Sequence, residues 1–79
     1  DQAQKKAFNN SIAKTTAEIA AREKLVNKDI SNGLAAIRIA KKEGISPQEL
    51  AKLENGVRTM QGQLATMTGN RKAIARLKL

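Results

Sequence analysis

The residues that could carry chemistry in this chain are carboxylates, lysines and hydroxyls, because its 79 residues include no Cys and no His. General base catalysis and nucleophile activation would depend on these groups alone. Glu49 and Glu54 do not share a helix face one turn apart, and Ser46 is occupied as a predicted helix cap. The glycines form no phosphate-binding loop, and no carboxylate cluster has metal-ligand spacing. We expect a protein without enzymatic activity, cofactor, metal site or small-molecule substrate.

The charge of the chain is strongly positive: 15 Lys and Arg residues oppose 7 Asp and Glu residues, for a formal net charge of +8. No acidic residue follows Glu54, so the excess collects toward the C-terminus. This balance favours nucleic acid, anionic lipid or an acidic protein surface as a neighbour. Phosphate contacts would be sensitive to salt and neutral to base sequence. The candidate polyanion contacts are Lys5, Lys6, Lys14, Arg71, Lys72, Arg76 and Lys78.

The first residue is Asp1 rather than methionine, which indicates that the chain is processed or trimmed. Cytoplasmic and secreted locations both stay open, because a chain without Cys does not report its redox compartment. No apolar run approaches the roughly 20 residues that a transmembrane helix needs, so we expect no membrane span.

The clearest signal of secondary structure is a predicted turn around residue 45, which separates two helices. Ser46 is a favourable N-cap, Pro47 takes the first helical position, and Glu49 follows three residues after the serine to complete a capping box. Gly44 suits the left-handed residue that ends a preceding helix. A turn this short, over residues 44–46, makes the two flanking helices antiparallel neighbours.

Apolar residues recur in steps of three and four on both sides of this turn, which is the heptad pattern of a coiled coil. After the turn, with an interruption at Arg71, they are Leu50, Leu53, Val57, Met60, Leu64, Met67 and Ile74. Before the turn, with exceptions at Glu23 and Gly33, they are Ile12, Thr16, Ile19, Val26, Ile30, Ile37 and Ala40. The sequence therefore predicts one all-α domain over residues 1–79. We expect a long, coiled-coil-like antiparallel hairpin with helices over about 2–43 and 47–78.

The segment Ser31–Gly33 is the weakest point of the first predicted helix, because a serine, an asparagine and a glycine could end it. The alternative fold is a three-helix bundle with a short middle helix over residues 34–43. The heptad pattern keeps its phase across Gly33, so we favour one continuous helix, with any kink placed at this glycine.

Glu23 and Arg71 interrupt the two apolar patterns at positions that face each other in a hairpin folded near residue 45. An ion pair there would set the register of the helices rather than add much stability, because desolvation offsets the attraction of the charges. The alternative is that Arg71 reaches into solvent from a frayed helix end, with its stem lying along apolar surface.

Two segments present more apolar or small surface than a two-helix hairpin can bury. Residues 34–40 are apolar nearly all round, and such a helix is normally buried on every side. The three glycines of the second helix each cost about 0.5–1 kcal/mol relative to alanine, and form a narrow uncharged strip. These glycines are either a packing surface or tolerated weak points. The candidate self-association residues are Leu34, Ile37, Ile39, Gly56, Gly62 and Gly69.

The five residues Pro47-Gln48-Glu49-Leu50-Ala51 resemble the start of the second helix in the small rod and needle subunits of type III secretion systems. Those subunits are helical hairpins of this size. The high positive charge and the missing C-terminal aromatic residues depart from that family. The resemblance therefore serves only as an analogy for how hairpins of this kind assemble with copies of themselves.

We expect first a structural or interaction protein, a basic helical hairpin that self-associates into an oligomer or filament. The second hypothesis is a nucleic-acid or polyanion-binding module that uses the basic C-terminal helix. A third is an adaptor for an acidic protein surface. Base-specific reading is disfavoured, because Phe8 is the only aromatic residue and the predicted helices are too long for a helix–turn–helix reader.

Overall fold

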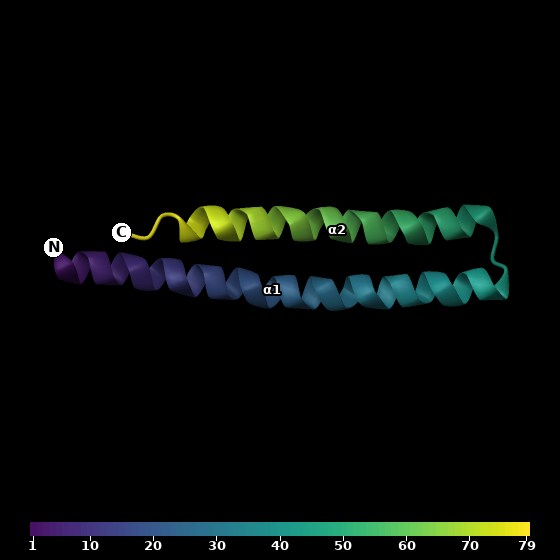
Figure 1. The fold of residues 1–79 in the computed structure, drawn as a ribbon, viewed down its shortest axis with the longest axis horizontal. Coiled ribbons are helices and arrows are strands. Elements are labelled where there is room, and N and C mark those ends of the chain that lie inside the picture. Colours follow the sequence, from purple (N-terminus) through teal and green to yellow (C-terminus); the bar gives the residue numbers. More distant parts are fainter.

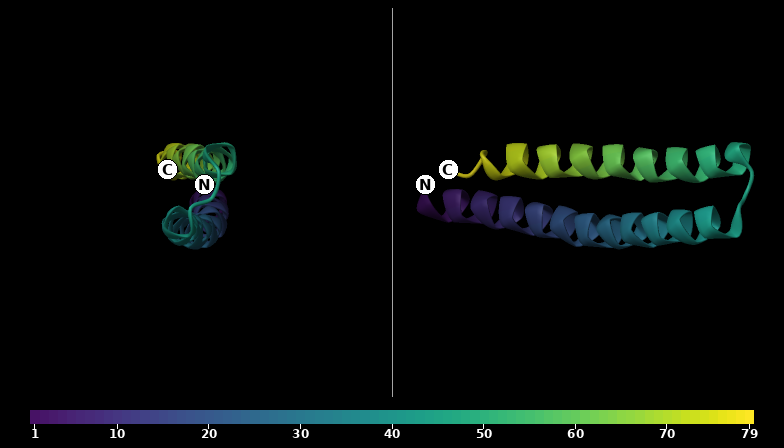
Figure 2. Two further views of the ribbon diagram at one scale, coloured as in Figure 1. Left: turned by 90° about the vertical axis from the view of Figure 1, so that its right-hand side faces the viewer. Right: turned by 45° about the vertical axis from the view of Figure 1, so that its right-hand side comes forward.

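The computed structural model describes residues 1–79, which form two α-helices joined by a short turn (Figure 1). Helix α1 spans Gln2–Glu43 and helix α2 spans Pro47–Ala75. The helices run antiparallel along each other, and both chain ends lie at the same end of the molecule (Figure 1, Figure 2). The Cα atoms fill a rod of 64 × 14 × 10 Å. The predicted all-α hairpin is confirmed.

The turn has the local chemistry that its sequence predicts. Gly44 ends α1 in the left-handed conformation, with φ 72° and ψ 39°, and its backbone N–H donates to the carbonyl groups of the last turn. Ser46 caps α2, where its Oγ accepts a hydrogen bond of 3.2 Å from the backbone N–H of Glu49. The return hydrogen bond from Glu49 to the Ser46 backbone is not formed, so one half of the predicted capping box is present. The reciprocal box forms instead at the start of α1, between Asp1 and Gln4.

Helix α1 continues without interruption across residues 31–33, so the three-helix alternative is wrong. Figure 1 shows α1 as a gently bowed helix rather than two segments meeting at an angle, a curvature typical of long helices that pack on one side. Gly33 lies on the face of α1 toward α2. A Cβ atom built on Gly33 would lie 2.8 Å from Cγ2 of Val57. The glycine allows α2 to approach closely at this level, rather than ending the helix.

The hydrophobic core is a thin line of aliphatic residues concentrated in the half of the hairpin near the turn. Only five residues are buried: Ile12, Ile30, Ile37, Ala40 and Val57. Three of them form the central cluster, Ile30, Ile37 and Val57, against which Val26, Leu50, Met60 and Leu64 pack. These are residues of the two predicted heptad patterns. Leu53, from the same pattern, remains exposed.

Helix α2 ends at Ala75, three residues before the predicted boundary. The backbone N–H of Leu77 donates to the carbonyl of Ile74 at 2.9 Å, a tightened hydrogen bond over three residues that closes the helix. The chain then reaches α1, where the Asn9 side chain pairs with Leu79. The Leu79 N–H donates to Asn9 Oδ1 at 2.9 Å, and Asn9 Nδ2 donates to the Leu79 carbonyl at 3.1 Å. This amide pairing holds the tail against α1.

Candidate interaction surfaces

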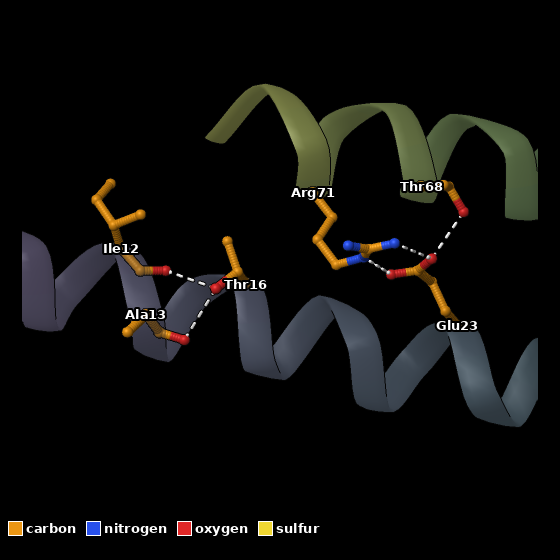
Figure 3. A network of polar contacts seen from close by, with 6 residues as sticks. All are labelled: Ile12, Ala13, Thr16, Glu23, Thr68 and Arg71. Atoms are coloured by element: carbon orange, nitrogen blue, oxygen red, sulfur yellow. Dashed lines mark hydrogen bonds and ion pairs between the residues drawn. The ribbon is translucent and has the colours of Figure 1, made fainter. Parts of the chain in front are cut away.

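One polar layer crosses the apolar seam, and it is built around Glu23 (Figure 3). Arg71 Nε donates to Glu23 Oε1 at 2.5 Å, and Arg71 Nη2 donates to Oε2 at 3.4 Å. The hydroxyl of Thr68 donates to the same Oε2 at 2.7 Å. The structure thus brings the predicted register pair together and adds Thr68, which sequence reasoning missed. Its position one turn before Arg71 on α2 was the available signal.

The surroundings of Glu23 in this layer favour the charged form of its carboxylate. The Glu23 side chain is 12 % exposed and that of Arg71 is 33 % exposed, so both are partly removed from water. The hydrogen bond from Arg71, and then the one from Thr68, lower the pKa of Glu23 below its ordinary 4.5, and outweigh the opposing effect of burial. A slip of the helices by one heptad would separate the charged partners while leaving each in the seam. We therefore expect the layer to set the register of the two helices.

A second hydroxyl on the seam is satisfied within its own helix. Thr16 Oγ1 donates to the carbonyl oxygens of Ile12 and Ala13, at 3.0 Å each (Figure 3). Thr16 therefore makes no polar contact with α2, unlike Glu23. This bonding explains how a threonine can take an apolar position of the heptad pattern.

A shallow groove of about 250 Å³ runs along one flank of the hairpin, between α1 and α2. Leu34 is exposed at this groove, while Ile37 and Val57 are core residues that reach it. The prediction grouped Ile37 with the outer contact residues, but the structure places it first in the core, at 8 % exposure. The residues lining the groove are Leu34, Ile37, Lys41, Glu54, Val57, Arg58 and Gln61.

The outer face of α1 carries two large aliphatic side chains in water. Leu25 is 65 % exposed and Ile39 is 58 % exposed. They lie two heptads apart, so they point from the same side of the helix about 21 Å from each other. Ile39 also lines a small hollow with Ala35, between the cations Arg38 and Lys42. Apolar groups of this size are left uncovered by α2.

The outer face of α2 carries the glycine strip. Gly56, Gly62 and Gly69 each have open space where a Cβ would lie, in contrast to Gly33. No charged residue occurs from Thr59 to Asn70, although the chain is 28 % charged. The three glycines therefore do not serve the packing of α2 on α1.

The predicted polyanion contacts separate into two groups. Arg71 is paired with Glu23 across the seam, so it is not a free cation. Lys5, Lys6, Lys14, Lys72, Arg76 and Lys78 are exposed. The pairing of Asn9 with Leu79 brings the basic tail back to α1 at Asn9, which lines one surface hollow with Lys5 and Lys6. Two basic segments at opposite ends of the sequence thus meet at the open end of the rod.

Comparison with known proteins adds no assignment: no family model, curated protein or solved structure matches the chain. The resemblance to rod and needle subunits therefore still rests on five residues. Neither helix has an apolar stretch long enough to cross a bilayer.

Proposed function

We propose that this chain is a non-enzymatic structural protein, a helical hairpin that packs side by side with copies of itself in an oligomer or filament. The observation that carries the proposal is that more large apolar side chains are exposed than are buried. Five residues are buried, whereas seven large hydrophobic residues are exposed. The exposed residues are Phe8, Leu25, Leu34, Ile39, Leu53, Leu77 and Leu79.

The size of the hairpin supports the same conclusion. A chain of 79 residues buries a modest share of its surface, and this one has neither disulfides nor aromatic residues in its core. A thin aliphatic seam of this kind gains stability when further helices cover its flanks. The groove beside Leu34, with Ile37 and Val57 reaching its floor, is a site that another helix can cover.

The positions of the exposed groups favour a contact between unlike faces. Leu25 and Ile39 project from the outer face of α1, whereas Gly62 and Gly69 lie on the outer face of α2, on the other side of the hairpin. Large side chains on one rod and small residues on the next make a complementary pair. A contact of this heterologous type repeats from copy to copy and builds rings or open filaments.

Sedimentation velocity of matched variants tests this proposal. Gly62→Leu and Ile39→Ser are each expected to raise the dissociation constant of the oligomer at least tenfold. Smaller species should then sediment, while the helical content of the protein is retained. Ala17→Leu is the control, because it enlarges a small exposed residue on α1 away from both surfaces. If both variants sediment like the parent protein, or if the parent is a monomer at high concentration, the proposal fails.

A further inference from the structure

The open end of the hairpin gathers most of the net charge of the molecule. Apart from Arg71, which Glu23 neutralises, seven of the 15 Lys and Arg residues lie within residues 1–22 and 72–79, against two of the 7 acidic residues. One of those acids, Asp1, is occupied as the cap of α1, where Oδ1 accepts a hydrogen bond of 2.9 Å from the Gln4 N–H. The other, Glu18, lies further along α1. The cations at the tip therefore have little acidic surface beside them.

The tail is held in place at this end rather than continuing α2. The two hydrogen bonds between the Asn9 side chain and the Leu79 backbone place the tail against α1. Lys5 and Lys6, from the first two turns of α1, line a surface hollow together with Asn9. Arg76 and Lys78 lie in the tail that Asn9 holds. Cations from two separate segments thus share one end of a narrow rod (Figure 1, Figure 2).

Exposed apolar residues lie among these cations. Phe8 precedes Asn9, and Leu77 and Leu79 alternate with the basic residues of the tail; all three are exposed. Leu79, at 69 %, is the most exposed large hydrophobic residue of the chain. Binding to a phosphate polymer would use the cations but leave these three side chains in water. The interface of an anionic bilayer accepts both kinds of group.

We propose that the open end of the hairpin binds the surface of an anionic lipid bilayer. Phe8, Leu77 and Leu79 enter the boundary between headgroups and acyl chains. Lys5, Lys6, Arg76 and Lys78 contact the lipid phosphates and carboxylates. The inference does not depend on self-association, because the outer faces proposed for side-by-side packing do not include the residues of this end.

Fluorescence of single tryptophan variants tests immersion of the tip directly, because the chain contains no Trp or Tyr. Phe8→Trp is expected to shift its emission to shorter wavelength with vesicles of phosphatidylserine and phosphatidylcholine, and to show no shift with phosphatidylcholine alone. Gln48→Trp, at an exposed position beside the turn at the other end of the rod, is the matched control and is expected to show no shift. The absence of a shift at position 8 on anionic vesicles, or equal shifts at both positions, overturns the proposal.

Vesicle co-sedimentation with charge-matched variants provides the second measurement, with circular dichroism to verify the fold. Lys5→Gln/Lys6→Gln is expected to weaken binding about 30-fold, whereas Lys24→Gln/Lys28→Gln, with the same loss of charge, changes it less than twofold. Leu77→Ser/Leu79→Ser is expected to weaken vesicle binding without changing the association with RNA. An equal loss of vesicle binding in both lysine variants would show that overall charge drives the binding, and it would overturn the proposed site. Binding to RNA in preference to vesicles, with no effect of the leucine variants, assigns the tip to nucleic acid.

Discussion

Gly33 of α1 and Val57 of α2 are matched in shape across the hairpin: a Cβ on the glycine would lie 2.8 Å from the valine Cγ2. Val57 is also the most buried residue in the molecule, at 6 % exposure. The side chain of Val57 therefore fills the space that the missing side chain of Gly33 leaves. This pair lies within the central apolar part of the hairpin, where the helices are held by packing alone.

Replacement of Gly33 by alanine is expected to destabilise the hairpin, although alanine is the better helix former. The added methyl group would overlap Val57, and overpacking of this kind costs about 1–3 kcal/mol, more than the gain of about 1 kcal/mol in helix propensity. Chemical denaturation measures the change. The double variant Gly33→Ala/Val57→Ala is the control, and its loss should be smaller than the sum of the two single losses. A Gly33→Ala protein more stable than its parent would contradict the close contact.

Replacement of Gly56 by alanine is expected to have the opposite effect within one chain. Nothing lies within 4 Å of the position of its Cβ, so the substitution gains about 0.5–1 kcal/mol of helix stability without a clash. Denaturation at a concentration where the protein is monomeric measures this gain. A loss of stability there would mean that Gly56 contacts something within the hairpin.

The layer of Glu23 and Arg71 predicts a defined response to acid. The pKa of Glu23 is lowered in the folded chain, so its contribution to stability is present above the ordinary pKa of 4.5 and is lost as the pH falls below that value. Thermal unfolding between pH 7 and pH 2.5 should show this loss, and Glu23→Gln should reduce it. If the two proteins respond to acid in parallel, the carboxylate is not held as the structure places it.

The same layer is expected to matter more for register than for stability. Glu23→Ala removes one partner and leaves Arg71 unpaired at the seam, so the melting temperature should fall. Glu23→Leu/Arg71→Leu replaces both partners with apolar groups and should melt at or above the temperature of the parent. A double variant that is less stable than the single variant would show that the ion pair is a net source of stability.

The turn and the two heptad patterns could be predicted from sequence because each depends on local chemistry or a regular period. Ser46 and Pro47 define a helix start by themselves, and the apolar steps carry through both helices. The partnership of Glu23 and Arg71 could also be inferred, since each is a charged interruption of an otherwise apolar pattern at facing levels.

Other features depend on contacts between distant residues. Gly33 has the same sequence signature whether it ends a helix or admits a neighbouring valine, and only the packing of α2 decides between them. The amide pairing of Asn9 with Leu79 joins residues 70 positions apart and has no pattern in the sequence. The sequence predicts Ile37 both for the heptad seam and for the outer contact surface, because the residues around it are apolar on all sides, and the structure buries it in the core.

The distance between a position in the first half of α1 and one near the end of α2 tests the hairpin most directly. Spin labels on cysteines introduced at Ala20 and Ala73, both exposed, are suited to pulsed electron resonance because the native chain has no Cys. With labelled protein diluted in unlabelled protein, the hairpin predicts a short separation within one chain, since packed helices lie about 10 Å apart. A separation of about 80 Å, the length of 53 residues in one straight helix, would contradict it.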